Sequence, residues 1–134
     1  MSKMPSWIND EMRQTIAQAV KYAENNPSNY GVLSVDTKDP GKVLQRSVDN
    51  NLKRWAGGEY PAPWVKDKPK KFVDFMQRRW APIGAENDPN NLNQNWAPNV
   101  RYYLRQKLGP ELYKQWQDMN LVYDRTALQD QRYV

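Results

Sequence analysis

Glu24 is the first residue whose type and position predict chemistry. It closes an amphipathic segment, "SWINDEMRQTIAQAVKYAENN", just before the turn "NNPSNYG". A carboxylate there faces the negative end of a helix dipole, and burial beside aromatic side chains would raise its pKa further. A carboxyl group that keeps its proton can act as the general acid in glycosidic cleavage. The alternative interpretation is a solvated helix-end residue paired with Lys21 or another basic residue.

A second carboxylate would complete such a site as nucleophile, base or electrostatic stabiliser. The candidates are Asp36, Asp39 and Glu59. Sequence spacing fixes none of them, so all three stay open.

Asparagine and tryptophan side chains gather in the segment "RRWAPIGAENDPNNLNQNWAPNV", between two helical stretches. Sugars need both kinds of group, because their hydroxyls pair with amides and their C–H faces stack on indole. The candidate ligand-binding residues are Trp80, Asn87, Asn91, Asn93, Asn95, Trp96 and Asn99. The competing interpretation is structural, since Asn caps helices and tolerates left-handed backbone while Trp fills cores.

A basic stretch surrounds "WVKDKPKKF" and continues into the next helix. Its members are Lys66, Lys68, Lys70, Lys71, Arg78 and Arg79. Near Trp64 they could bind phosphates with an aromatic stacker beside them, whereas the ordinary interpretation is a solvated charged face. The formal net charge of +5 likewise favours an anionic partner or simply indicates a basic surface.

The composition excludes several kinds of chemistry. Cysteine and histidine are both absent. Disulfides, Ser–His and Cys–His nucleophile pairs and the commonest metal ligand are therefore excluded. No phosphate-binding, dinucleotide or zinc motif is present. We expect neither a metal nor a cofactor, and any catalysis must rest on carboxylates, hydroxyls or lysine.

The hydrophobic pattern predicts a mostly α single domain of about five helices joined by long Pro- and Asn-rich loops. The expected helices cover residues 6–26, 40–56, 69–80, 96–108 and 111–121. Ser6 should cap the first, and Asp39 with Pro40 should begin the second. Gly109–Pro110 should separate the last two. Residues 1–121 then form the helical domain, and residues 122–134 form a C-terminal tail that could act as a docking segment.

Between the first two helices, Val32, Leu33 and Val35 predict a short strand or an extended loop. Six Trp and eight Tyr, with few branched aliphatics, predict a core built around aromatic rings. No apolar run approaches the roughly 20 residues of a membrane span. The N-terminal segment has no apolar stretch typical of a signal peptide, which predicts synthesis in a cytoplasm.

Parts of the chain resemble small proteins of tailed bacteriophages. The segment "FVDFMQRRWAPIGAENDPNNLNQNW", followed by "NVRYYL", looks like a recurring pattern in such proteins. The first helix ending in Glu24, followed by "NPSNYG", is similar to phage lysozyme-like and transglycosylase-like domains. A helix end of the "RYAP" type recurs there and matches Arg79 to Pro82, and a later "W..NV" helix matches Trp96, Asn99 and Val100.

The resemblance covers about two thirds of the chain and implies a helical lysozyme-like fold. It also implies that Glu24 is the acid and that the Asn/Trp loop lies along a glycan cleft. The glutamine-bearing turn of transglycosylases is not clear here; Gln45 is its nearest counterpart, and Ser47 could take the hydroxyl role.

These patterns lead to three hypotheses. The first is a virion-associated protein that binds and cleaves peptidoglycan glycan strands with Glu24, made in the host cytoplasm. The second is a non-catalytic virion component that docks to other virion proteins, because phages also reuse such folds without activity. The third and weaker hypothesis is a binder of nucleic acid or of a host protein through the lysine stretch.

Overall fold

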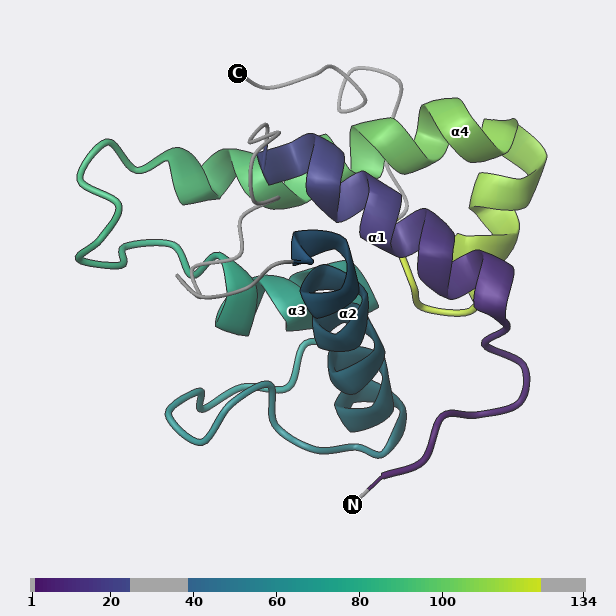
Figure 1. The fold of residues 1–134 in the computed structure, drawn as a ribbon, viewed down its shortest axis with the longest axis horizontal. Coiled ribbons are helices and arrows are strands. Elements are labelled where there is room, and N and C mark those ends of the chain that lie inside the picture. Colours follow the sequence, from purple (N-terminus) through teal and green to yellow (C-terminus); the bar gives the residue numbers. More distant parts are fainter. Residues whose placement is uncertain (1, 25–38, 124–134) are drawn as a thin grey trace.

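The structure, a computed structural model, describes residues 2–24 and 39–123, in which four α-helices and one short 3-10 helix surround a single core (Figure 1). The α-helices are α1 (Asp10–Glu24), α2 (Pro40–Ala56), α3 (Phe72–Trp80) and α4 (Trp96–Asp118), and the 3-10 helix η1 (Leu92–Asn95) precedes α4. This confirms the mostly α single domain. The predicted strand or extended loop around Val32 lies outside the described residues.

Helix α1 begins later than the sequence pattern predicts. The chain makes a turn in which the Ile8 amide donates to the Pro5 carbonyl at 3.1 Å. Asn9 rather than Ser6 then caps the helix, because its side chain accepts a hydrogen bond from the Met12 amide at 2.9 Å. The apolar positions still share one face, with Ile16 and Val20 fully buried.

Helix α2 has the predicted boundaries. The Asp39 side chain accepts from the Lys42 amide at 3.1 Å, and Pro40 occupies the first turn. At the other end the Gly57 amide donates to the Lys53 carbonyl at 2.9 Å. Leu44, Val48 and Leu52 therefore form one buried stripe.

The two last predicted helices are one helix with a kink. Gly109 has a φ of 79° and a ψ of 168°, which interrupts the helical backbone inside α4, and Pro110 follows it. The break falls at the expected residues, but the chain resumes as helix immediately. The expectation of about five helices therefore becomes four among the described residues.

The end of α4 supports the start of α3. Asn120, with a φ of 62°, ends α4 in a Schellman arrangement, since the Leu121 amide donates to the Trp116 carbonyl at 2.9 Å. The carbonyls of Asn120 and Leu121 then accept from the first two amides of α3, those of Phe72 and Val73, at 2.8 and 3.2 Å. These amides have no partner within their own helix, so the C-terminal turn satisfies them.

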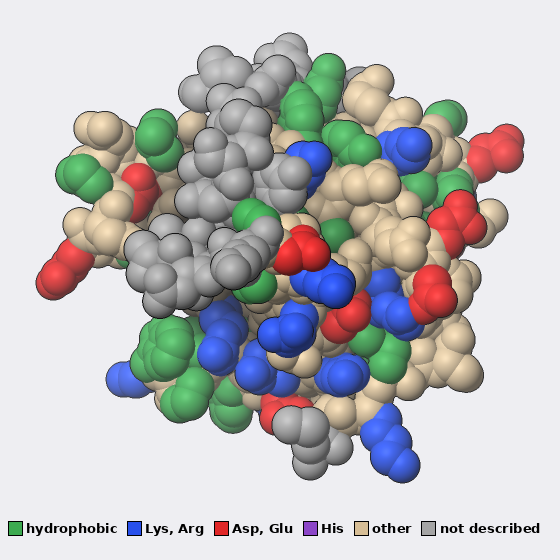
Figure 2. All heavy atoms as spheres, viewed as in Figure 1, with side chains coloured by type: hydrophobic (Ala, Val, Ile, Leu, Met, Phe, Trp, Pro, Cys, Tyr) green, Lys and Arg blue, Asp and Glu red, His purple; other side chains and the backbone are tan. Residues whose placement is uncertain are grey.

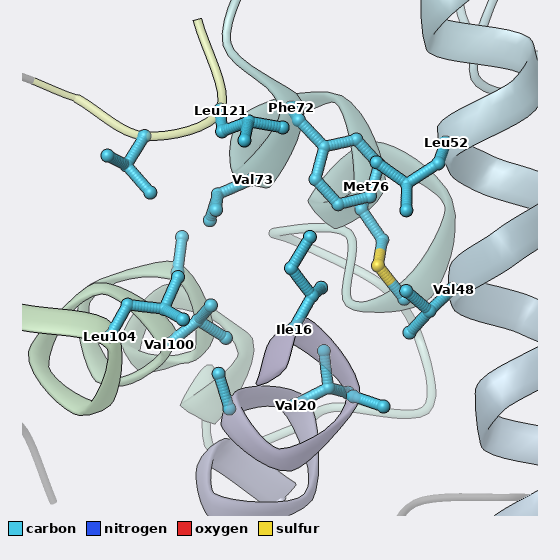
Figure 3. Close-up of a cluster of buried hydrophobic side chains, with 14 of the residues drawn as sticks. Ile16, Val20, Val48, Leu52, Phe72, Val73, Met76, Val100, Leu104 and Leu121 are labelled. Carbon is cyan, nitrogen blue, oxygen red and sulfur yellow. The ribbon is translucent and has the colours of Figure 1, made fainter. Parts of the chain in front are cut away.

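Helices α1 and α4 pack against each other, α2 packs on α1 and on α3, and α3 packs on α4 (Figure 1). The side chains in their centre point toward one another and are largely aliphatic (Figure 3). Of the six Trp residues only Trp96 and Trp116 are buried, while Trp64 is 66% exposed. The expectation of a core built mainly around aromatics is therefore wrong for the described residues, because Ile, Val, Leu and Ala from four helices fill it. The core continues through Leu121 to Val122.

One ion pair lies inside the helical packing. Asp74 of α3 and Arg101 of α4 are both at least nine-tenths buried, with 3.7 Å between the carboxylate and guanidinium. The pair joins the two helices. None of the helices in the described parts of the chain is long and apolar enough to cross a membrane.

Candidate functional site

Glu24 lies where three elements meet. The last residue of α1 receives a hydrogen bond from the indole Nε1–H of Trp80, the last residue of α3. The indole N–H of Trp96, at the start of α4, lies near enough to the same carboxyl to lower its pKa. That N–H is buried and makes no hydrogen bond within the usual limits to any described acceptor. We call Glu24, Trp80 and Trp96 the Glu24 site.

The local sequence explains why these side chains meet. Helix α3 ends at Trp80 because Ala81 leaves the helical conformation and Pro82 follows. Helix α4 begins at Trp96, after the turn of η1. Because α1 packs against α4, the end of α1 comes close to both indoles. The carboxyl of Glu24 thus accepts a hydrogen bond from the Trp80 indole and lies beside that of Trp96, instead of being a solvated helix-end group paired with Lys21.

The pKa of the Glu24 carboxyl lies above its ordinary value of 4.5. Burial raises the pKa because the charged form loses its hydration, and this is the largest effect. The Trp80 indole opposes the shift by donating to the carboxylate, and the nearby Trp96 N–H also lowers the pKa. The net direction is upward, so Glu24 keeps its proton at a higher pH than an exposed glutamate does.

The second carboxylate remains open. Asp36 lies outside the described residues. Asp39 caps α2, and Glu59 follows the other end of that helix, where it accepts a hydrogen bond from the Ser2 hydroxyl. Because a helix of 17 residues is about 25 Å long, Asp39 and Glu59 cannot both flank one sugar linkage beside Glu24.

The asparagine segment organises its own backbone. The side chain of Asp88 accepts hydrogen bonds from the amides of Leu92 and Asn93, both at 2.8 Å. The Asn93 amide group donates to the Pro82 carbonyl at 2.8 Å, and Asn91 has a φ of 55°. Such contacts match the structural interpretation of the asparagines. Asn87, Asn91 and Leu92 are exposed, whereas Asn93, Asn95 and Asn99 are half-buried.

The structure also locates Gln45 and Ser47, which the sequence analysis compared with the glutamine-bearing turn of transglycosylases. The Gln45 amide group donates to the Arg13 carbonyl and to the Asp49 carboxylate, each at 3.1 Å. The Ser47 carbonyl accepts from the Asn51 side chain at 2.8 Å. Both residues therefore make contacts within α2 or between α2 and α1.

The predicted basic stretch does not act as one unit. Lys71 donates to the Gln117 carbonyl and to the Asn120 side chain, where it completes the end of α4. Arg78 pairs with Asp67 at 3.2 Å. Lys66 and Lys70 are exposed. Lys68 and Arg79 instead lie beside exposed aromatic rings.

These rings belong to a second feature, which we call the aromatic–basic surface. It consists of Arg54, Tyr60, Trp64, Lys68 and Arg79. The Arg79 guanidinium carbon lies 5.6 Å from the centroid of the Trp64 ring, and the Lys68 ammonium lies 5.0 Å from that of Tyr60. Sequence reasoning noted Trp64 but missed Arg54 and Tyr60, since nothing in the chain order shows that α2 and α3 bring both arginines to this connector.

Two hollows on the described part of the chain lie around the end of α2, and Glu24 lines neither of these two. One, of about 570 Å³, is lined by Arg54, Glu59, Tyr60, Ala62, Pro63, Trp64 and Arg79. The other, of about 230 Å³, lies between the end of α2 and residues 68–70. No group of three or more acidic side chains that could hold a metal ion occurs within the described ranges. Comparisons with protein-family models, curated proteins and solved structures find no significant match to this chain.

Proposed function

We propose that this chain is a small lysozyme-like domain that binds peptidoglycan glycan strands, with Glu24 as the general acid for their cleavage. One observation carries the proposal: the carboxyl of Glu24 is bonded by the Trp80 indole and lies beside that of Trp96. The carboxyl, the indoles and the asparagine segment are thus neighbours, the combination that a sugar-cleaving site needs.

The raised pKa supports the acid role. A general acid must hold its proton until the leaving oxygen takes it, and burial of the Glu24 carboxyl, which raises its pKa, favours the protonated form. The hydrogen bond from the Trp80 indole also orients the carboxyl. Activity should therefore be highest at mildly acidic pH and fall as pH rises through the pKa of Glu24.

The test is a murein zymogram with analysis of the released fragments. The wild-type protein should clear the gel, and Glu24→Gln should abolish clearing while the melting temperature at neutral pH does not fall. Gln keeps an oxygen that can accept from Trp80 and is uncharged, which suits the buried position. Glu86→Gln, an exposed change in the 81–91 segment, is the matched control and should clear normally. A well-folded wild-type protein that clears nothing refutes the catalytic role.

The second candidate function is that of a non-catalytic virion component. The contacts of Glu24 with Trp80 and Trp96 are then structural rather than catalytic. The Trp80–Glu24 hydrogen bond joins α1 to α3, so the carboxyl can have a structural role in which it stabilises the packing of these helices. Under this function, deletion of the residues after Tyr123, which leaves the buried Val122 in place, should abolish particle assembly, whereas Glu24→Gln, which keeps an acceptor for Trp80, should leave assembly intact. Co-purification of the wild-type protein with virions is the direct measurement.

A further inference from the structure

The aromatic–basic surface has features that core packing does not explain. Trp64 is 66% exposed and Tyr60 is 50% exposed, so neither ring is there to fill the interior. Both rings line the hollow of about 570 Å³. Figure 2 shows Lys and Arg side chains gathered beside a group of hydrophobic ones, in the region where Figure 1 draws α2 and the connector that follows it.

The two arginines of this hollow outnumber its one acidic residue, Glu59, among the described side chains. No carboxylate there lies within ion-pair distance of Arg54 or Arg79. Glu59 lines the same hollow, but its carboxylate accepts a hydrogen bond from Ser2. Arg54 and Arg79 both line this hollow, where burial, and then the positive charge of Arg54, lowers the pKa of Arg79. Two guanidinium groups are thus close together at a place that would favour an anion.

The surface is also held in position before any ligand arrives. The Arg79 guanidinium donates to the Pro61 carbonyl at 3.3 Å while it lies over Trp64. Pro61 and Ala62 are buried, and Pro63 precedes Trp64 directly. Fixed proline dihedrals and a buried anchor reduce the flexibility that binding would otherwise have to remove.

The chemistry of the surface selects among anionic ligands. A glycan strand needs amides and hydroxyls around the aromatic ring, whereas the polar groups here are mainly guanidinium and ammonium. Single-stranded nucleic acid matches these groups, because each nucleotide carries one phosphate that a cation can bind and one unstacked base that can stack on an aromatic ring. A duplex keeps its bases stacked, so the exposed rings could not reach them.

We propose that the aromatic–basic surface binds single-stranded nucleic acid, with bases stacked on Trp64 and Tyr60 and phosphates bound by Arg54 and Arg79. Arg79 can take part in both the stacking and the phosphate binding, because a guanidinium stacked on a ring still has N–H groups at its edge that can donate to a phosphate. This site is separate from Glu24 and does not depend on the glycan-cleaving function.

The test uses the full chain and a fluorescent oligothymidylate of about 12 nucleotides, a length in the range that small single-strand binders cover. Anisotropy should rise on binding, and Trp fluorescence should be quenched. Trp64→Ala should weaken binding about tenfold or more, and Trp64→Phe should restore most of it, because a stacking face is kept. Arg54→Ala and Arg79→Ala should each lower the salt dependence of log K by about 0.7.

Lys114→Ala is the matched charge control, since Lys114 is exposed on α4 and outside this surface. It should leave the Trp64-dependent quenching unchanged. Three results would each overturn the proposal: no binding at low salt by folded protein, equal binding of polyglutamate, or binding that Trp64→Ala does not alter. Preferential binding of peptidoglycan fragments at Trp64 would assign the surface to glycan instead and would also refute it.

Discussion

Arg79 and Trp80 are neighbours in the sequence, yet they belong to chemically different regions. Successive residues of a helix point about 100° apart, so the last turn of α3 serves both. Trp80 donates its indole N–H to the half-buried carboxyl of Glu24. Arg79 lies over the exposed ring of Trp64, on the aromatic–basic surface.

The two regions treat polar groups in opposite ways. In the Glu24 site the carboxyl accepts a hydrogen bond from one indole and lies beside the other, so its interactions are mainly with groups of the protein rather than with water. On the aromatic–basic surface the arginines lack carboxylate partners among the described residues and stay near water. A buried group without partners would cost stability, whereas exposed cations without partners cost little and can bind an anion. Changes in the first region should therefore act on stability, and changes in the second on binding.

The largest expected difference is between two tryptophans replaced in the same way. Trp96 is 4% exposed, and Trp96→Ala should lower the free energy of unfolding by about 3–5 kcal/mol through lost burial and a cavity. Trp64→Ala should change it by no more than about 0.5 kcal/mol, because that ring is mostly in water already. Chemical denaturation of both variants measures the contrast.

Equal losses of stability in these two variants would contradict the division between the regions. Trp116→Ala provides a control for Trp96, because Trp116 is 3% exposed in α4. It should destabilise by a similar amount while leaving the pKa of Glu24 unchanged.

A smaller effect is expected when only the hydrogen bond of the Glu24 site is removed. Trp80→Phe keeps a large aromatic ring but deletes the N–H that donates to Glu24. An acceptor that loses a partner in a partly buried place costs about 1–3 kcal/mol. Thermal unfolding at neutral pH should show the loss, while Trp64→Phe should leave the transition unchanged. An unchanged melting temperature of Trp80→Phe would mean that water replaces the indole as donor and that the Glu24 carboxyl is solvated.

Helix boundaries could be predicted from the sequence where a single residue type determines them. Asp39 with Pro40 and the glycines after Ala56 set the ends of α2 in both sequence and structure. The start of α1 was predicted wrongly because Ser6 and Asn9 are both good caps, and only the turn closed by Pro5 and Ile8 selects Asn9. The Gly109–Pro110 break was located correctly, because Gly109 leaves the helical conformation there, although helix resumes at once on the other side of the kink.

Contacts between distant segments were harder to predict. The sequence pointed to Glu24, Trp80 and Trp96 by residue type, and the structure shows them together; their chemical role stays a prediction. The aromatic–basic surface depends on how the 57–71 connector folds back on α3, which no local pattern encodes. The buried Asp74–Arg101 pair was missed because a charged residue on an amphipathic helix is normally solvated.

The finest distinction concerns how the two regions respond to pH. Folded Glu24 has a raised pKa, so between 4.5 and that higher value the folded chain binds more protons than the unfolded chain. Its contribution to stability is therefore largest at low pH and is lost as pH rises through this window. Glu24→Gln lacks the titrating group, so its melting temperature relative to wild type should increase from about pH 4 to about pH 8. Glu86→Gln controls for the loss of one negative charge at an exposed position. A difference between Glu24→Gln and wild type that stays constant over this range would mean that Glu24 is solvated, and the acid role would then lose its physical basis.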